Sequence, residues 1–155
     1  MIERSEIISA LGEFSKTRIL VVGDILLDRF IVGEVERISP EAPIPILRVT
    51  DEDVMLGGAG NVARNLAALG INTTCVSVIG NDAAGDNIES LLDQTHSMQS
   101  KLIRDEMCPT FIKARFLAGN QQMMRADWEG VQVLSEHLGK LLIESACSEM
   151  KNCDA

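Results

Sequence analysis

Apolar residues follow two different spacings along the chain, and each spacing predicts its own kind of element. Apolar positions three and four residues apart predict amphipathic helices over residues 5–14, 61–69, 84–94 and 134–150. Compact apolar runs predict buried strands over residues 18–22 and 73–79, and shorter strands over 101–104, 110–118 and 121–127. This alternation is typical of an α/β fold with a mostly parallel sheet and right-handed crossovers.

Residues 29–50 do not fit that alternation. Their strand-like runs are interrupted by three prolines, Pro40, Pro43 and Pro45. Because proline has no backbone N–H to donate to a neighbouring strand, it is excluded from the centre of a sheet. We therefore expect an edge or a projecting hairpin here.

Residues 151–155 follow the last predicted helix and resemble a loop that leads into a further strand. A crossover helix connects two parallel strands, and no strand is predicted after the helix at residues 134–150. We therefore expect the chain to hold the first half of a domain.

Composition narrows the class of protein. The 155 residues suffice for a domain with a hydrophobic core, and 46% apolar with 24% charged residues excludes intrinsic disorder. Fourteen basic and 23 acidic residues give a net charge of −9, which argues against nucleic-acid partners and against binding to anionic membranes. No apolar run approaches the ~20 residues that span a bilayer, so a cytoplasmic protein is expected.

The sulfur-containing residues suggest no redox or metal chemistry. The cysteines include no Cys-x-x-Cys pair; they are Cys75, Cys108, Cys147 and Cys153. We interpret them as reduced thiols, some of them buried. Met123 and Met124 are interpreted as flexible side chains that fill the core.

The strongest local motif is Gly57-Gly-Ala-Gly60, directly before the helix predicted at residues 61–69. Glycines let the backbone approach a ligand closely, and a helix N-terminus offers free N–H groups. The alternative is that these glycines only form a tight turn. The motif is not the phosphate-binding G-x4-G-K-[ST] loop, which the sequence lacks.

Two acidic residues, Asp24 and Asp28, follow the strand predicted at residues 18–22. Ligands of open α/β sheets bind at the carboxyl ends of the strands. A carboxylate suits sugar hydroxyls because its oxygens accept charge-assisted hydrogen bonds. The alternative is that Asp24 caps a turn and Asp28 is solvated.

Lys113 and Arg115 alternate with apolar residues in the strand predicted at 110–118, so both side chains point to the same face. Arg125 lies in the next predicted strand. A basic pair in an acidic protein is suited to a phosphate group. The alternative is a solvated strand face.

Together these segments resemble the PfkB, or ribokinase-like, family of carbohydrate kinases, from about residue 10 to the end. The likeness is greatest to the branch that phosphorylates heptose 7-phosphate. Arg-Ile-Ser-Pro-Glu-Ala-Pro and Asn-Gln-Gln-x-x-Arg-x-Asp mark that branch, whereas Gly-Gly before a helix marks the whole family. The segments that carry the resemblance are Val21–Arg29, Arg37–Pro45, Gly57–Ala63, Asn65–Gly70, Gly80–Asp82 and Asn120–Asp127.

The resemblance implies the N-terminal part of a ribokinase-like sandwich, with residues 29–50 as a lid that also builds a homodimer. It implies that Asp28 holds sugar hydroxyls. The same pocket would be lined by Asp24, Gly57, Gly58 and Asn61. The 7-phosphate and its surroundings would be contacted by Lys113, Arg115 and Arg125.

The family's second signature, a Gly-Ala-Gly-Asp loop with the anion hole and the catalytic base, does not occur in these 155 residues. The resemblance implies that the complete enzyme phosphorylates D-glycero-D-manno-heptose 7-phosphate at the anomeric hydroxyl with ATP and Mg²⁺, for ADP-heptose and lipopolysaccharide core synthesis. Residues 1–155 would be its sugar-binding half. That half would lack the ATP-binding lobe, catalytic residues and metal ligands, and would be inactive alone.

Two alternatives stay open. The chain could belong to another PfkB sugar or nucleoside kinase. It could also be a non-catalytic fragment that binds a sugar phosphate or dimerises. It lacks the His-x-x-His motif of the adenylyltransferase domain that bifunctional relatives carry.

Overall fold

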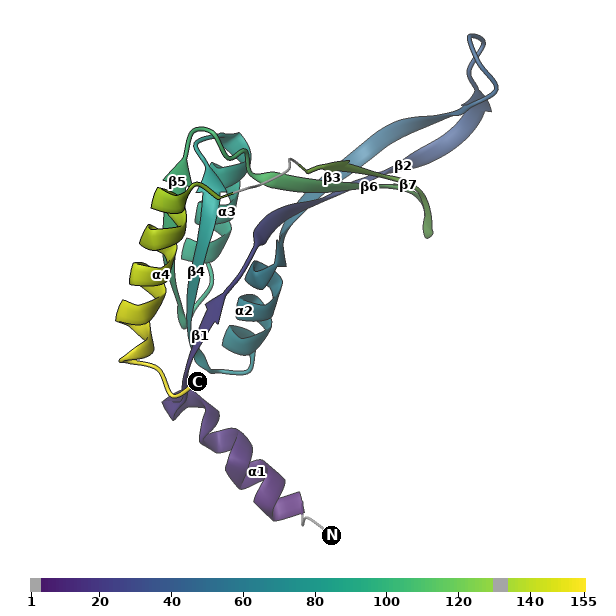
Figure 1. Cartoon of the computed structure of the whole chain (residues 1–155). Coiled ribbons are helices and arrows are strands. Elements are labelled where there is room, and N and C mark those ends of the chain that lie inside the picture. The colour runs from purple at the N-terminus through teal and green to yellow at the C-terminus, as the bar shows by residue number, and fades with distance from the viewer. Residues whose placement is uncertain (1–3, 130–133) are drawn as a thin grey trace.

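The computed structural model of the chain describes residues 4–129 and 134–155, which form two β-sheets with helices around them (Figure 1). The first sheet is parallel throughout, in the order β1–β4–β5. Its strands are β1 (Arg18–Val22), β4 (Asn72–Gly80) and β5 (Met98–Asp105). The helices beside it are α2 (Ala59–Ala68), α3 (Ala83–Asp93) and α4 (Glu136–Met150). The predicted α/β fold is thus confirmed.

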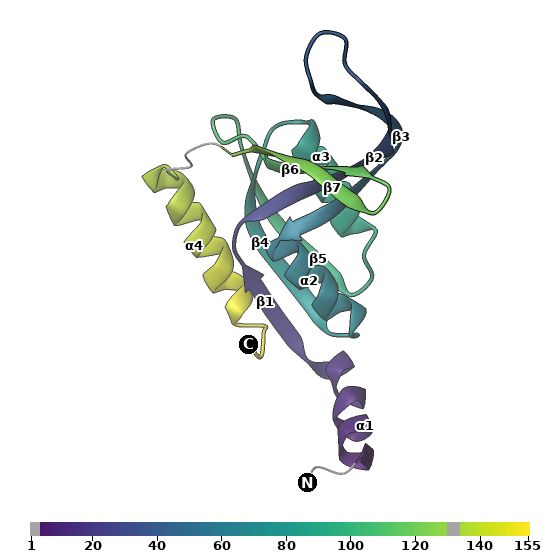
Figure 2. The ribbon, with the colours of Figure 1, turned by 90° about the vertical axis from the view of Figure 1, so that its right-hand side faces the viewer.

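The helices cover both faces of this parallel sheet. Helices α2 and α3 each precede the next parallel strand, and right-handed crossovers place both on one face. Helix α4 packs on the other face, so that the sheet lies between α4 and the pair α2 and α3 (Figures 1 and 2).

The second sheet extends away from these layers and has the order β3–β2–β6–β7. Strand β2 forms an antiparallel hairpin with β3, lies parallel to β6 on its other side, and β7 runs antiparallel to β6. The strands are β2 (Ile25–Ile38), β3 (Pro45–Gly58), β6 (Phe111–Ala118) and β7 (Gln121–Trp128).

The β2–β3 hairpin confirms the prediction of a projecting hairpin (Figure 2). Pro40 and Pro43 lie in its turn, and Pro45 begins β3, where no ladder hydrogen bond is lost. The hairpin is longer than residues 29–50, because β2 already begins at Ile25. Asp28 therefore lies within a strand of the second sheet and not in a loop.

Two irregularities interrupt the pairing of β2 with β3, between Val32 and Gly33 and between Val35 and Arg37. The backbone is crowded there: a Cβ on Gly33 would lie 2.4 Å from the carbonyl oxygen of Arg48. Such bulges bend a strand and increase its twist. They separate the inner part of the hairpin from its tip.

The hydrophobic core lies where the second sheet meets α3 and β4. Leu27 of β2, Ile79 of β4 and Ile88 of α3 are at most 2% exposed. Each such side chain contributes about 1.5–3 kcal/mol on burial. The core thus fixes the inner part of β2, where Asp28 lies.

Three expectations about burial were wrong. Strand β1 is an edge strand that is only half-buried, and Val22 is 47% exposed. Met123 and Met124 are exposed on β7 instead of filling the core. Helix α1 (Arg4–Gly12) forms as predicted and is followed by a 3-10 turn, η1 (Phe14–Lys16), yet it projects from the body and leaves Ile8 and Leu11 exposed (Figure 1).

The last residues run along the outer edge of β1. The Leu20 N–H donates to the Ala155 carbonyl oxygen at 2.8 Å, and the Asp154 N–H donates to the Arg18 carbonyl oxygen at 2.8 Å. The segment predicted to lead toward a strand therefore already makes strand-like hydrogen bonds with β1.

The Gly80–Asp82 motif joins three segments at the carboxyl end of β4. Asp82 caps α3 by accepting from the Gly85 N–H at 2.8 Å, and it also accepts from the Thr110 N–H at 2.8 Å. Burial alone would raise the pKa of Asp82, but these hydrogen bonds outweigh it and lower the pKa. A Cβ on Gly80 would lie 2.4 Å from Asp82 Oδ2, so this arrangement of hydrogen bonds requires glycine at that position.

Candidate functional site

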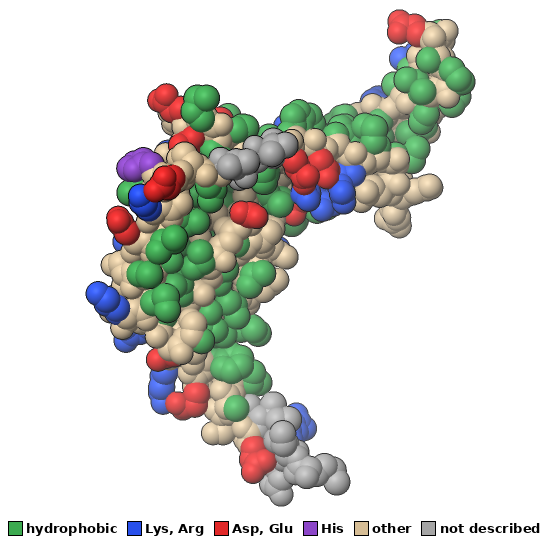
Figure 3. Space-filling view, in the orientation of Figure 1, with side chains coloured by type: hydrophobic (Ala, Val, Ile, Leu, Met, Phe, Trp, Pro, Cys, Tyr) green, Lys and Arg blue, Asp and Glu red, His purple; other side chains and the backbone are tan. Residues whose placement is uncertain are grey.

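One face of the second sheet carries charged side chains, while the other face packs on the core. Asp28 lies opposite Lys113 across β2 and β6, and Arg115 lies opposite Arg125 across β6 and β7. Residues opposite each other on neighbouring strands point to the same face of a sheet, and so do residues two apart in one strand. Lys113 and Arg115 therefore lie on one face of the sheet, as predicted. We call Asp28, Lys113, Arg115, Arg125 and Asp127 the charged face. Basic and acidic side chains gather on this projecting sheet in Figure 3.

Asp28 and Arg115 form an ion pair in the middle of the charged face. Nη1 of Arg115 donates to Oδ1 of Asp28. The side chains are only 23% and 20% exposed, for Arg115 and Asp28 respectively. The Arg115 guanidinium also lies over the Phe30 ring, with its carbon 5.3 Å from the ring centroid. The alternative of a solvated Asp28 is therefore wrong.

The two other basic residues of this face also contact carboxylates. Lys113 Nζ lies 2.8 Å from Glu129 Oε1, and Arg125 Nε lies 2.8 Å from Asp127 Oδ1. Sequence reasoning missed Glu129 and Asp127 as partners, although Asp127 stands two residues from Arg125 in a strand and so must share its face.

Gly57 leaves space for the Asp28 carboxylate. It pairs with Leu26 in the β2–β3 hairpin, and a Cβ on Gly57 would lie 2.6 Å from Asp28 Oδ2. Arg115 thus contacts the carboxylate at Oδ1, while Oδ2 occupies space that a Cβ on Gly57 would need. A tight turn alone does not explain this contact.

Gly58 connects β3 to α2 beside Asp24. Its φ of +57° favours glycine, and a Cβ would lie 2.3 Å from the Asp24 carbonyl oxygen. That oxygen accepts the Ala59 N–H at 2.9 Å. The glycine pair therefore brings the start of α2 next to the turn between β1 and β2.

Ser77 of β4 holds that turn by hydrogen bonds, although sequence reasoning did not single it out. The buried Ser77 hydroxyl donates to the Gly23 carbonyl oxygen at 2.6 Å and accepts the Ile25 N–H at 3.2 Å. Ser77 is a polar residue within the apolar run of β4, and this was the feature of the sequence that could have pointed to it. The Asp24 side chain itself is exposed.

Asn61 lies in the first turn of α2, where its side-chain oxygen accepts from Arg64 at 3.0 Å. The structure therefore brings Asp28, Lys113, Arg115 and Arg125 onto one sheet face. Asp24, Gly57, Gly58 and Asn61 gather around the start of α2, joined to that face through the contact of Gly57 with Asp28.

The thiol of Cys108, in the loop before β6, is influenced by the charge of Asp24. Burial raises its pKa, and the charges of Asp105 and Asp24 raise it further. It is a buried, protonated group. All four cysteines are free, and two of them, Cys75 and Cys108, are buried, in agreement with the prediction that some would be.

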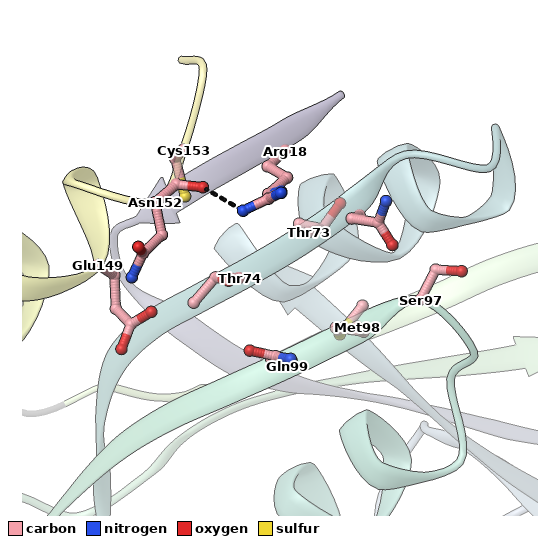
Figure 4. A pocket seen from close by; sticks show the side chains of 10 residues that line it. Arg18, Thr73, Thr74, Ser97, Met98, Gln99, Glu149, Asn152 and Cys153 are labelled. Atoms are coloured by element: carbon pink, nitrogen blue, oxygen red, sulfur yellow. Dashed lines mark hydrogen bonds between the residues drawn. The ribbon is translucent and has the colours of Figure 1, made fainter. Parts of the chain in front are cut away.

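Two cavities in the described part of the chain are lined by residues outside the charged face. A cavity of about 60 Å³ adjoins Asp24. A larger polar one of about 600 Å³ lies at the amino ends of β4 and β5, beside the end of α4 (Figure 4). There Arg18 donates to the Asn152 carbonyl oxygen at 3.4 Å. Ligands of such sheets bind at the carboxyl ends of strands, so a cavity at the amino ends of β4 and β5 is a weak candidate for the site.

Residues 4–129 and 134–155 contain no group of three His, Cys, Asp or Glu side chains arranged to hold a metal ion. In the same described part of the chain, no helix is both long enough and apolar enough to cross a membrane.

Comparison with known proteins agrees with this architecture. The bifunctional protein HldE of Rhodospirillum rubrum is 46% identical over 151 residues, which cover 97% of this chain and 30% of that protein. The HldE of Caulobacter sp. strain K31 is 52% identical over 116 residues, 75% of this chain and 24% of that protein. The chain thus spans less than a third of the length of these relatives.

Solved structures show the same fold. Phosphofructokinase-2 from Escherichia coli in complex with fructose-6-phosphate superposes with a TM-score of 0.65 at 26% identity, over 85% of this chain and 42% of that one. A putative phosphofructokinase from Staphylococcus aureus gives 0.66 at 21% identity, over 83% and 39%. The profile described as pfkB family carbohydrate kinase matches residues 16–153. The chain therefore belongs to the pfkB family of carbohydrate kinases.

Proposed function

We propose that this chain is the sugar-binding part of a kinase that phosphorylates D-glycero-D-manno-heptose 7-phosphate at its anomeric hydroxyl, for ADP-heptose and lipopolysaccharide core synthesis. The observation that carries the proposal is the charged face. It sets a carboxylate, Asp28, beside Lys113, Arg115 and Arg125 on one sheet surface. A carboxylate accepts hydrogen bonds from sugar hydroxyls, and basic side chains donate hydrogen bonds to a phosphate.

The heptose assignment draws on more than the charged face. Two HldE proteins match at 46% and 52% identity. The segments Arg37–Pro45 and Asn120–Asp127 resemble the heptose branch, and they lie at the hairpin tip and along β7. The fructose-6-phosphate complex of the Escherichia coli neighbour supports a sugar phosphate as the class of ligand.

The role of the described residues is to bind and orient the acceptor. In this proposal Asp28 accepts sugar hydroxyls, with Asp24, Asn61 and the Gly57–Gly58 backbone around it. The basic residues hold the 7-phosphate at a distance from the reacting hydroxyl, and such remote binding serves to position the reacting group. ATP, with its Mg²⁺, supplies the phosphoryl group of the complete enzyme in the cytoplasm.

We further propose that residues 1–155 alone do not transfer phosphate. The Gly-Ala-Gly-Asp signature is absent from their sequence. A positioned general base contributes about 10²–10⁴-fold to a rate, and anion-hole donors contribute a similar factor.

The β2–β3 hairpin is proposed to be the lid and the dimer contact. Its outer part exposes an apolar groove of about 410 Å³ where it adjoins β6 and β7. The groove is lined by Val35, Ile44, Pro45, Leu47, Phe116, Met123 and Met124. A second copy of the hairpin would cover this apolar surface, and closure over the sugar would exclude water.

Calorimetric titration of the chain with a panel of sugars, sugar phosphates and nucleosides tests this function. Tightest binding of heptose 7-phosphate supports it, whereas tightest binding of another sugar or a nucleoside favours another kinase of the family. A second assay tests the proposal that residues 1–155 alone do not transfer phosphate. The chain is incubated with Mg·ATP and heptose 7-phosphate, and the release of ADP is measured. Sustained heptose-dependent ADP release would contradict the proposal that these residues are inactive alone.

A further inference from the structure

We propose that Arg115 makes this site selective for phosphorylated sugars, because its guanidinium passes from Asp28 to the substrate's phosphate on binding. The inference rests on the proposed function, in which Asp28 receives hydroxyls and the basic residues receive a phosphate. It adds an exchange of ion-pair partners, of which the Asp28–Arg115 pair is the starting state.

The charged face neutralises itself before any ligand arrives. Lys113, Arg115 and Arg125 each contact one carboxylate, from Glu129, Asp28 and Asp127 respectively. A sugar phosphate carries nearly two negative charges at neutral pH. It therefore competes with the carboxylates for these cations.

The exchange has its largest effect at Arg115, because its pair is the most buried. Arg115 and Asp28 are 23% and 20% exposed, whereas Glu129 and Arg125, one member of each other pair, are 48% and 49% exposed. Water and salt screen the exposed pairs. A charge left without a partner at Asp28 or Arg115 is correspondingly more costly.

The geometry links this exchange to sugar recognition. Asp28 Oδ1 accepts from Arg115, while Oδ2 faces the backbone of Gly57. When the guanidinium turns to a phosphate, Oδ1 becomes free to accept a sugar hydroxyl. A sugar without phosphate must separate the same ion pair and offers Arg115 no anion in return, so it binds more weakly.

Arg115 is suited to serve two anions in turn. The Phe30 ring beneath it holds the planar guanidinium in place by a cation–π contact. Only Nη1 is used in the pair with Asp28, and a guanidinium has five N–H donors. A small movement therefore suffices for the exchange.

The test is calorimetric titration of the 155-residue chain with four ligands: heptose, heptose 7-phosphate, fructose and fructose 6-phosphate. We expect the wild type to bind one phosphorylated sugar at least about tenfold more tightly than its unphosphorylated form, the scale of one charged hydrogen bond. Arg115→Gln should lose that preference while binding of the unphosphorylated sugar stays equal or improves. Arg115→Lys keeps the charge and should keep the preference.

Arg29→Gln is the matched control. It removes another arginine–carboxylate pair, with Glu52, on the opposite face of β2, the strand that carries Asp28. It should leave the preference intact. Equal weakening of both ligand forms by Arg115→Gln would show that Arg115 only holds Asp28, and would overturn the exchange.

Other outcomes separate this inference from the proposed function. A preference for fructose 6-phosphate that Arg115→Gln abolishes supports the exchange and contradicts the heptose assignment. Equal wild-type affinity for both forms overturns the exchange, and no binding of any ligand overturns both. If Arg115→Gln fails to fold in a thermal melt, inorganic phosphate titrated into Asp28→Asn decides: the freed Arg115 should bind it more tightly, and unchanged affinity overturns the exchange.

Discussion

The carboxylate of Asp82 is shared between the first turn of α3 and the N–H of Thr110, two segments that the fold brings together at the carboxyl end of β4. Asp82→Ala should lower the free energy of unfolding by about 1–3 kcal/mol, through loss of a helix cap and of a second hydrogen bond. Urea denaturation measures this. Asp93→Asn, an exposed acid at the other end of α3, should change little.

The same residue predicts a pH dependence. Its hydrogen bonds hold the folded-state pKa below the ordinary value of 3.8. Its contribution to stability is therefore complete above that value and is lost as the pH falls through the folded-state pKa. Asp82→Ala should show a smaller loss of stability on acidification than the wild type, and an unchanged acid profile would contradict the assignment.

Thiol reactivity should differ sharply among the cysteines. Burial raises the pKa of Cys75 to about 11, and the thiolate is the reactive form. At pH 8, iodoacetamide should therefore modify the exposed Cys147 first and spare Cys75 until the chain is unfolded. Peptide mass spectrometry measures the order. Early modification of Cys75 in the folded chain would show that the core around β4 opens.

Asp28→Asn should weaken the hydrogen bonds to the sugar hydroxyls by about 1.5–3 kcal/mol, the scale of a charge-assisted hydrogen bond. This loss should exceed the gain in phosphate binding from the freed Arg115. The amide retains the shape of the side chain but accepts more weakly, and calorimetry should record the loss. Thermal stability should also fall, because the Arg115 guanidinium loses its charged partner. Sugar affinity that stays at the wild-type level would remove Asp28 from the site.

Gly57→Ala should also weaken sugar binding, because the added methyl group would lie 2.2 Å from Leu26 Cδ1 and 2.6 Å from Asp28 Oδ2, so both side chains would have to shift. Gly139→Ala in α4, where no atom lies within 4 Å of the added carbon, is the control and should leave binding unchanged. Equal affinities of the two variants in calorimetry would show that Asp28 tolerates the displacement.

Dimerisation through the hairpin is tested by deleting residues 31–47, which should convert a dimer to a monomer in sedimentation velocity. Met124→Glu is the milder companion, since it places a charge in the apolar groove and leaves the hairpin in place. A dimer that survives both changes would locate the contact elsewhere.

Much of the fold follows from local patterns. The spacing of apolar residues correctly predicted the strands near 18–22, 73–79, 101–104, 110–118 and 121–127. It did not reveal that β1 is an edge strand or that Met123 and Met124 are exposed. Those properties depend on which elements lie alongside, and no local window contains that information.

In the candidate site, too, local patterns predicted some features and missed those that depend on neighbouring elements. Alternation within one strand placed Lys113 and Arg115 on a common face, and the structure agrees. Their carboxylate partners come from other strands or beyond a strand end, so the pairing of Asp28 with Arg115 depends on the register between β2 and β6. Neither that register nor the contact of Gly57 with Asp28 is encoded in any short motif.

The bulges of β2 have a mechanical consequence. Inside Val32 the strand is anchored by Leu27 in the core and carries Asp28, whereas beyond Gly33 it leaves the body toward the tip. A pleated strand is stiff between such irregularities, so bending concentrates at them. We therefore expect bending of the hairpin to concentrate at these two irregularities, which would move its tip relative to the body while Asp28 keeps its place.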